Sequence, residues 1–326
     1  MNQYSITVAI PVFNGGKYIT EALDSIINQS LLPDEIIIAD DNSTDNTLDI
    51  VAEWHTRNEF IKLRIINNPT NIGYGKNLDV CLDSCKTKFI QFLHQDDILT
   101  NQCLEHNLNA FKDNPGLALV GGREKHVNER KESLSDNKKS FSDIEFRRGQ
   151  VCEFIVKMSH YIPVSSVMLD VDKAKNVGHF VVENLSYDEL FWVKTVQKYP
   201  IKILGKINIL RRMHGENLEY EWFFKKEKEF VKTCLFLIKR LPDFEISKEK
   251  KKIIRAHEKK RTAKLFIAIA SLIVKKYKNH FISFKYLTNS ILVDIRSLTF
   301  KSFWKTIIIN TLIFTGLYNH LKRNNT

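Results

Sequence analysis

Two groups of acidic residues, each following an apolar run, are the clearest candidates for chemistry in the chain. The first is residues 40–45, which also include Asn, Ser and Thr, and the second is Asp96 with Asp97. The first group alone is compatible with an ordinary helix N-terminus, where such side chains satisfy backbone donors. The second differs, because adjacent carboxylates at the end of a buried strand repel each other unless a cation or donor groups compensate. Mg²⁺ or Mn²⁺ suits such oxygen ligands and in turn binds substrate phosphates.

The elements around these groups predict one crevice. Apolar residues alternate from Ile6 to Val12 as in a strand, and those that follow have helical spacing. The predicted strands are residues 6–12, 35–39, 62–66 and 88–93, and the predicted helices are residues 19–26, 45–55 and 76–85. This order predicts an α/β fold, with a mainly parallel sheet flanked by helices in the Rossmann-like manner. Because ligands bind at the carboxyl ends of such strands, the polar residues after them should converge.

Taken together, these segments resemble the large family 2 of inverting glycosyltransferases with the GT-A fold, of the type that makes bacterial cell-surface polysaccharides. The resemblance is carried by residues 7–14, 40–45, 71–73 and 92–97. It implies a nucleotide-diphosphate sugar as the donor and a saccharide or lipid-linked hydroxyl as the acceptor. It also implies that Pro11, Phe13 and Asp41 line the base and ribose of the donor.

The metal-binding motif departs from the family's usual form. Where many members carry an Asp-x-Asp triplet, this chain has His94, Gln95 and Asp96. Ligation of Mg²⁺ or Mn²⁺ then rests mainly on Asp96, and the adjacent Asp97 is expected to help hold the donor.

Basic residues for a leaving diphosphate are also present. Residues 211–215 resemble the family's basic segment that ends in His-Gly, which implies that Arg212 pairs with the diphosphate and that His214 contacts the metal or the diphosphate. Lys76 is a weaker candidate for the diphosphate, and Asn14 completes the predicted donor-binding set. An ordinary solvated basic loop is the alternative interpretation of residues 211–215.

The middle of the chain has less regular patterning. Residues 123–143 are rich in Lys, Glu, Ser and Asn, which predicts a mobile loop or an irregular hairpin. Apolar segments resume at Val151, and a helix is predicted over about residues 188–198.

A candidate catalytic base opens that helix. A weaker match to the family runs up to Trp192, and counting back from it puts Asp188 at the family's catalytic base and Tyr187 where a Glu is usual. Glu189 is the second candidate for the base. The alternative is that both carboxylates only begin a helix, where its dipole favours negative charge.

The last third of the chain differs from the rest in charge. Residues 223–326 contain 24 Lys and Arg against 7 Asp and Glu, a net charge of +17, which leaves −6 on residues 1–222 from the total of +11. Apolar runs at residues 265–274 and 307–318 are shorter than the roughly 18–20 residues that span a bilayer. They suit helices lying on an anionic membrane surface, and a packed helical subdomain is the alternative.

We therefore expect two domains. The GT-A catalytic domain would comprise residues 1–222, with a nucleotide-binding half (1–100) and an acceptor-side half (101–222), and residues 223–326 would form a helical, basic, membrane-associating region. Five scattered cysteines and no signal peptide after Met1 favour a cytoplasmic protein, peripheral on the inner face of the cell membrane.

Two other functions fit parts of the sequence. A nucleotidyltransferase also uses a parallel sheet, a metal and carboxylates, but it normally has a Gly-rich basic loop after the first strand, for which residues 13–17 are a thin substitute. A nucleic-acid-binding protein could use the basic tail. The aromatic residues there, such as Trp304, lie among Ile and Leu as core residues do, so we expect no nucleic-acid partner.

Overall fold

The chain forms two compact units, Met1–His214 and Gly215–Thr326. The computed structural model describes residues 3–134, 141–158, 162–182, 185–186, 188–215, 227–273, 280–294, 297 and 300–314. The predicted domain boundary after residue 222 lies outside the described residues.

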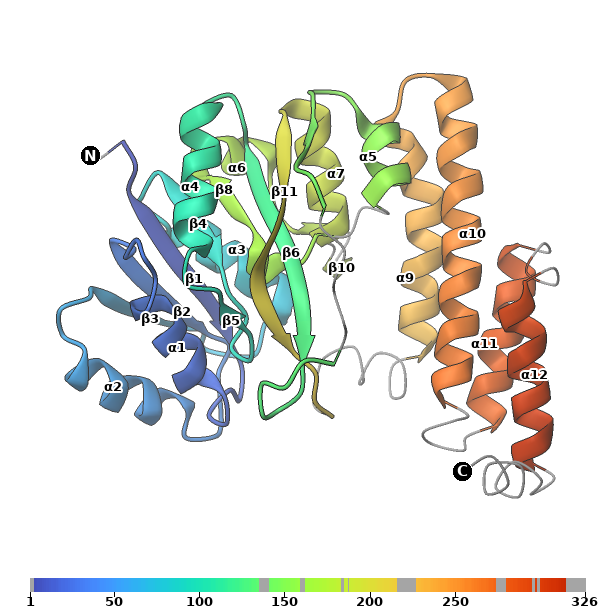
Figure 1. The fold of residues 1–326 in the computed structure, drawn as a ribbon, viewed down its shortest axis with the longest axis horizontal. Helices are drawn as coiled ribbons and strands as arrows, with labels where there is room; N and C mark the ends of the chain where they lie inside the picture. The colour runs from blue at the N-terminus through green and yellow to red at the C-terminus, as the bar shows by residue number, and fades with distance from the viewer. Residues whose placement is uncertain are drawn as a thin grey trace. The chain divides into compact units, whose positions relative to one another are not determined.

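A nine-stranded sheet forms the centre of the first unit (Figure 1). Its strands follow the order β3-β2-β1-β4-β8-β6-β11-β5, with β7 paired to β11. The bounds are β1 (Ile6–Val12), β2 (Glu35–Asp40), β3 (Leu63–Asn67), β4 (Phe89–Phe92), β5 (Ile98–Leu99), β6 (Leu119–Val127), β7 (Ile144–Phe146), β8 (Met168–Asp170) and β11 (Ile201–Arg212). A separate hairpin pairs β9 (Val181–Val182) with β10 (Leu185–Ser186).

Strand direction gathers the polar loops at one edge of this sheet. The strands β3, β2, β1 and β4 are parallel, as are β6 and β11. Because β8 is antiparallel to both β4 and β6, those two also run the same way. The carboxyl ends of β1, β2, β4, β6 and β11 therefore meet at one edge, the place where open α/β sheets bind ligands.

Helices cover both faces of the sheet (Figure 1). The helices α1 (Ile19–Ile27), α2 (Thr47–Arg57) and α4 (Cys103–Asp113) contribute to one apolar core with the sheet. In α1 the buried residues Ile19, Ala22, Leu23 and Ile26 recur at helical spacing, so one stripe faces this core. The other face carries α3 (Tyr74–Ser84), α6 (Val171–Val177) and α7 (Asp188–Lys198), and α5 (Val151–Met158) contacts α7.

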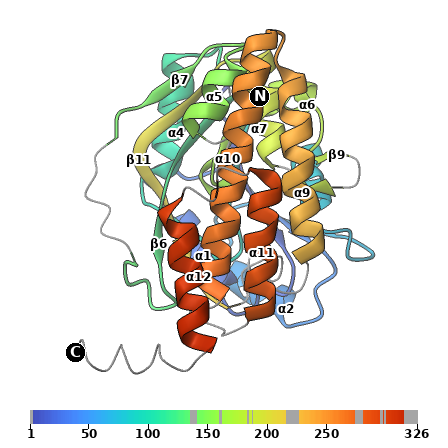
Figure 2. The same ribbon diagram turned by 90° about the vertical axis from the view of Figure 1, so that its right-hand side faces the viewer.

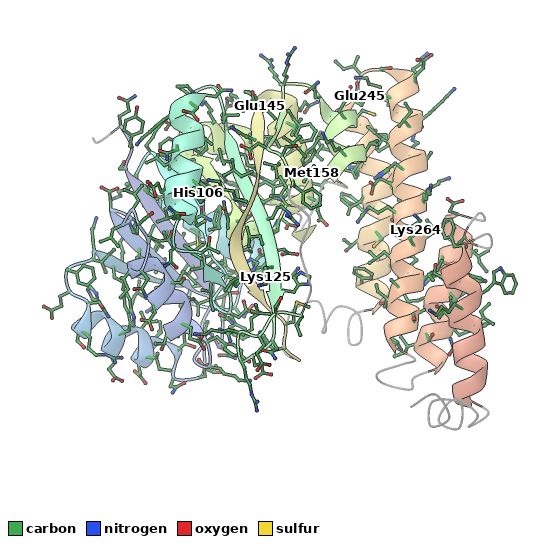
Figure 3. The ribbon with its side chains drawn as sticks, in the orientation of Figure 1. His106, Lys125, Glu145, Met158, Glu245 and Lys264 are labelled. Carbon is green, nitrogen blue, oxygen red and sulfur yellow. The ribbon has the colours of Figure 1, made fainter. Side chains whose placement is uncertain are left out.

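The predicted α/β class with a parallel half and flanking helices is confirmed. The expected loop over residues 123–143 is wrong at its start, because β6 continues to Val127; Lys125 lies toward that end of the strand (Figure 3). An irregular hairpin is confirmed between His126 and Leu134, whose main chains hydrogen-bond at 3.0 Å. The charged strand residues are held by pairing with β11, a contact that local periodicity does not reveal.

The second unit is a bundle of helices (Figure 2). Its bounds are α9 (Glu227–Arg240), α10 (Lys248–Leu272), α11 (His280–Val293) and α12 (Lys301–Phe314), with a short 3₁₀ turn at Leu241–Phe244. The apolar run that begins at residue 265 supplies much of the bundle core. Its buried members are Phe266, Ile267, Ile269, Ala270 and Ile273, packed with Tyr286, Leu287 and Phe303. Within the described residues, no helix is long and apolar enough to cross a membrane.

Candidate active site

Asp41 follows β2 and fixes the turn that precedes α3. Its buried carboxylate accepts hydrogen bonds from the backbone N–H groups of Ile72 and Gly73, both at 2.8 Å, and from the Asn68 amide at 3.1 Å. Gly73 has φ +89°, a left-handed conformation that favours glycine. The turn therefore depends on a charged acceptor and a permissive residue, and it sets the position of Tyr74. Contact of Asp41 with a base or ribose stays a prediction.

The exit of β1 presents an aromatic ring beside the acidic loop. Pro11 is buried within β1, whereas the Phe13 side chain is 44% exposed. The Gln95 amide accepts from Phe13 N at 2.9 Å and donates to Phe13 O at 3.1 Å. Asn14, at φ +49°, accepts at Oδ1 from the backbone N–H of Thr44 at 2.8 Å. The ring is thus held by its main chain at the sheet edge, a suitable arrangement for stacking on a nucleobase.

The pKa values of Asp96 and Asp97 are shifted in opposite directions from the ordinary value. Asp97 is buried, and burial together with the charge of Asp96 raises its pKa to about 7. Its carboxylate accepts from the Ser165 hydroxyl at 2.6 Å and from the backbone N–H of Arg212 at 3.2 Å. Burial also disfavours the Asp96 charge, but the 2.9 Å hydrogen bond with His214 contributes most to outweighing this, and the Asp96 pKa is lowered. One carboxylate of the pair is therefore ionised at neutral pH while the other is near its midpoint.

His94 joins this pair in a group that can hold a divalent ion. The ligand atoms of His94, Asp96 and Asp97 lie within 4.8 Å of one another. Burial lowers the pKa of His94, which favours the neutral imidazole, the form that can act as a metal ligand. An imidazole nitrogen with two carboxylates fits a first-row divalent ion such as Mn²⁺. The sequence carried the signal, since His94 stands where the family usually has Asp, but no role was predicted for it.

Arg212 is fully buried, 0% exposed, and its side chain has a bracing role, which here means that it links three separate segments. Its guanidinium donates to the carbonyl oxygens of Asp96 at 3.1 Å and Glu129 at 2.7 Å, and to the Glu21 carboxylate at 3.0 Å. The guanidinium also lies 4.8 Å from the Tyr18 ring centroid. As placed, Arg212 links α1, the Asp96 turn and the loop after β6, and its contact with a diphosphate stays a prediction. The solvated-loop alternative does not hold for this residue, because the end of β11 is buried there.

His214 and Lys76 lie differently from Arg212. The His214 ring packs on Tyr18, with centroids 4.7 Å apart, while its Nε2 faces Asp96. That position next to Asp96 is compatible with the predicted metal contact, which is still a prediction. Lys76 is exposed in the first turn of α3.

Arg211, one position before Arg212, is a residue of the site that sequence reasoning missed. Its guanidinium lies 3.6 Å from the Glu124 carboxylate, which also bonds the His126 ring at 2.8 Å. Its positive charge acts on Tyr74, His94 and Asp97, and so lowers the pKa of each relative to burial alone. Arg211 and Arg212 are consecutive residues of β11, so their side chains point to opposite faces of the strand. This explains why their surroundings differ.

Asp188 is the first residue of α7 and is half-buried. Burial and the neighbouring charge of Glu189 raise its pKa well above the ordinary value. Burial raises the pKa of the Tyr74 phenol, and the charges of Asp188 and then Asp97 add to this effect. The pKa of this one phenol is therefore raised both by the predicted base and by Asp97 of the group that can hold a divalent ion. Tyr187 lies outside the described residues.

The chain is similar to known sugar-transferring proteins. The profile of Glycosyl transferase family 2 matches residues 7–168. Chondroitin synthase of Escherichia coli is 25% identical over 228 residues, which are 69% of this chain and 31% of that protein. The chain therefore spans less than a third of this curated relative.

Two solved structures share the fold. S. aureus TarS (residues 1–349) in complex with UDP-GlcNAc superposes with a TM-score of 0.64 at 21% identity, over 96% of this chain and 93% of that one. The mannosyltransferase PcManGT from Pyrobaculum calidifontis, in complex with GDP-Man and Mn²⁺, superposes with a TM-score of 0.55 at 14% identity, over 96% and 87%. The match of the family profile to residues 7–168, with the motifs that these residues carry, shows that this part of the chain belongs to glycosyl transferase family 2, and the two solved structures share its fold.

Proposed function

We propose that this protein transfers a sugar, with inversion, from a nucleotide-diphosphate sugar to an acceptor hydroxyl during synthesis of a cell-surface polysaccharide. The observation that carries the proposal is the group formed by His94, Asp96 and Asp97 at the carboxyl edge of a sheet whose sequence matches the family 2 profile. The charges of Asp188 and Asp97 both raise the pKa of the Tyr74 phenol, which contacts His94, and this supports a role for Asp188 beside that group. A nucleotidyltransferase or a nucleic-acid-binding protein does not account for this combination.

Asp188 has the properties of a general base for this reaction. The acceptor oxygen attacks the anomeric carbon, its proton passes to the Asp188 carboxylate, and the bond to the diphosphate breaks with its electron pair on the phosphate oxygen. A carboxyl whose pKa is raised by burial is a stronger base when ionised, and such catalysis is worth about 10²–10⁴ in rate. The carboxylate has no need to bond to the sugar.

The other residues bind and orient the donor. Phe13 offers its half-exposed ring to the base, and the turn anchored by Asp41 lies at the next strand end. Asp96, Asp97 and His94 are the residues that would hold a divalent ion. That ion, when bound, supplies Lewis-acid stabilisation to the diphosphate. Because the TarS structure contains UDP-GlcNAc, a uridine nucleotide is the first donor to test.

UDP is expected to stabilise the protein only in the presence of Mn²⁺ or Mg²⁺, because the ionised Asp96 otherwise repels the diphosphate. At about 100 times its Kd, a ligand adds about 2.7 kcal/mol, or on the order of 5 °C in melting temperature. Differential scanning fluorimetry with UDP, dTDP and GDP, each with Mn²⁺ or EDTA, measures this.

Two controls make the melting experiment decisive. Uridine lacks the diphosphate and should give no Mn²⁺-dependent shift, and Asp96→Asn should lose the Mn²⁺ dependence of the UDP shift. Equal stabilisation by UDP in EDTA would rule out a metal-bridged diphosphate. If none of the three diphosphates shifts the melting temperature, the nucleotide-sugar proposal is wrong.

We also propose that the second unit binds an anionic membrane surface. Six exposed cations lie along α10: Lys248, Lys252, Arg255, Lys259, Lys260 and Lys264. Large apolar side chains are also exposed on this unit, with Phe284 at 64%, Leu292 at 82% and Trp304 at 52%. Cations near exposed aromatic and aliphatic groups are typical of proteins that lie on lipid headgroups. The buried members of the apolar run that begins at residue 265 are not part of this surface; they are Phe266, Ile267, Ile269, Ala270 and Ile273.

Reversing three of the α10 cations should release the protein from anionic vesicles. Each Lys near such a surface contributes about 1 kcal/mol, so Lys252→Glu, Lys259→Glu and Lys260→Glu together should weaken binding to phosphatidylserine vesicles by at least about 100-fold. Vesicle co-sedimentation measures this. The control reverses Lys86, Lys157 and Lys206, which are exposed on the first unit, and changes net charge equally. Equal binding by both triple variants would show that α10 is not the contact.

A further inference from the structure

The imidazole of His94 lies between a phenol and a carboxylate. Its Nε2 is 2.7 Å from the Tyr74 hydroxyl oxygen, and its Nδ1 is 3.6 Å from Oδ2 of Asp97. The first distance is that of a hydrogen bond, and the second is too long for one. The backbone N–H of His94 donates to the Ser165 hydroxyl at 3.0 Å, and that hydroxyl donates to the same Asp97 oxygen. The ring is therefore fixed by contacts on its main chain and on one nitrogen only.

These contacts direct the other nitrogen toward the carboxylates. A tyrosine hydroxyl can accept a hydrogen bond as well as donate one, so Tyr74 can accept the Nε2 proton of His94. The neutral imidazole then carries its lone pair on Nδ1, the nitrogen facing Asp97. In metal sites a histidine ligand almost always donates its second ring N–H to a carboxylate, a backbone carbonyl or water, which sets the tautomer and the ring orientation. In this chain the Tyr74 hydroxyl oxygen lies at that position. Tyr74, the first residue of α3, is in position to accept this hydrogen bond from His94.

An imidazole ligand changes which ion a site prefers. Mg²⁺ demands oxygen ligands and keeps much of its water, whereas Mn²⁺ and later first-row ions accept imidazole readily. If the family's usual Asp stood at position 94, residues 94–97 would supply only carboxylate oxygens as acidic or imidazole ligands. The group in this chain offers one nitrogen with the carboxylates of Asp96 and Asp97.

We propose that His94 binds the divalent ion through Nδ1, that Tyr74 holds it in that orientation, and that the site therefore selects Mn²⁺ over Mg²⁺. This inference rests on the proposed function, which supplies the reason for a divalent ion in the crevice. In these terms His94 is a metal ligand and Tyr74 is a positioning residue.

Direct metal binding tests the proposal without any sugar transfer. The full-length protein is titrated with Mn²⁺ in the presence of UDP, free Mn²⁺ is measured by its electron paramagnetic resonance signal, and Mg²⁺ is added to displace the bound ion. The ratio of the Mg²⁺ to the Mn²⁺ dissociation constant gives the selectivity. His94→Asp, which restores the family's usual residue, should lower this ratio about tenfold or more. Tyr74→Phe should weaken Mn²⁺ binding by about 10–100-fold.

Two further variants keep the result interpretable. His94→Asn removes the nitrogen without adding a third carboxylate, so it should also lose selectivity if His94→Asp folds poorly. Tyr199→Phe is the matched control for Tyr74→Phe, because Tyr199 lies past the opposite end of α7 from Asp188 and its hydroxyl bonds Asn176. It should bind Mn²⁺ like the unmodified protein. An unchanged ratio in folded His94→Asp or His94→Asn, or no Mn²⁺ binding by the unmodified protein, overturns the proposal.

A parallel assay separates this inference from the proposed function. Hydrolysis of UDP-GlcNAc and of other nucleotide sugars is followed with saturating Mn²⁺ for the unmodified protein. Donor turnover combined with an unchanged Mn²⁺ to Mg²⁺ ratio in the His94 variants means that only the ligand assignment fails. Metal selectivity that depends on His94, with no turnover and no binding of any nucleotide sugar, means that the site stands and the enzymatic function fails.

Discussion

Asp188→Asn is expected to lower turnover by about 100-fold or more while donor affinity stays nearly unchanged. Asn keeps the size of Asp and most of its hydrogen bonding but cannot accept the proton of the acceptor hydroxyl. Stability should not fall, because the raised pKa means that the folded protein already disfavours the charged carboxylate beside Glu189. Initial rates with a transferable donor give the turnover, and UDP titration gives the affinity.

Glu189→Gln is the matched control, one residue along the same helix turn. If Asp188 is the base, Glu189→Gln should retain most activity, and the lost charge should lower the pKa of Asp188 because Glu189 helps to raise it. The acidic limb of the pH–rate profile should then move to lower pH. Full activity in Asp188→Asn with an inactive Glu189→Gln would move the base by one residue. Activity retained in both would remove the proposed mechanism.

Arg212→Met should lower the free energy of unfolding of the first unit by about 3–5 kcal/mol, the usual cost of breaking a buried ion pair. The substitution leaves two carbonyl oxygens, those of Asp96 and Glu129, without the donor they have now. It also removes the partner of Glu21 on α1, although Lys131 still pairs with that carboxylate at 2.5 Å. Urea denaturation followed by tryptophan fluorescence measures the loss.

Arg211→Met provides the comparison on the same strand. Arg211 is part-exposed and its guanidinium lies 3.6 Å from the Glu124 carboxylate, so its replacement should lower the free energy of unfolding by less than replacement of the fully buried Arg212. Comparing the two variants shows whether Arg212 acts as a structural brace or as a ligand of the diphosphate. If Arg212→Met folds with normal stability and loses only UDP affinity, Arg212 is the diphosphate contact predicted from the sequence and the brace interpretation is wrong.

The elements that local pattern could predict are those with strong periodicity or clear caps. The helix predicted over about residues 188–198 is α7, and the strand predicted over residues 6–12 is β1. In each case the spacing of apolar residues within one continuous segment is enough to predict the element. Acidic residues after strands also pointed correctly to one sheet edge, because the parallel order of β1, β2 and β4 brings their ends together.

What the sequence could not provide was contact between distant segments. The sequence predicts Arg212 as a diphosphate contact, with a solvated loop as the alternative, but its burial depends on Glu21 and Glu129, which lie far from it in the chain. Tyr74 had no predicted role, since only the turn anchored by Asp41 brings its hydroxyl to His94. A charged side chain gives the same local signal whether it faces water or a buried partner.

The separation in sequence of these partners bears on how the protein folds. Asp97 and Arg212 are 115 positions apart, and Glu21 and Arg212 are 191 apart. Contacts of such high order are slow to form, because the loop-closure entropy is lost before the contacts compensate. The last strand to complete the crevice is β11, so a nascent chain that has not reached it carries both aspartates without their backbone and imidazole partners. The proposed metal site would therefore have all of its partners only when the first unit is fully synthesised and closed.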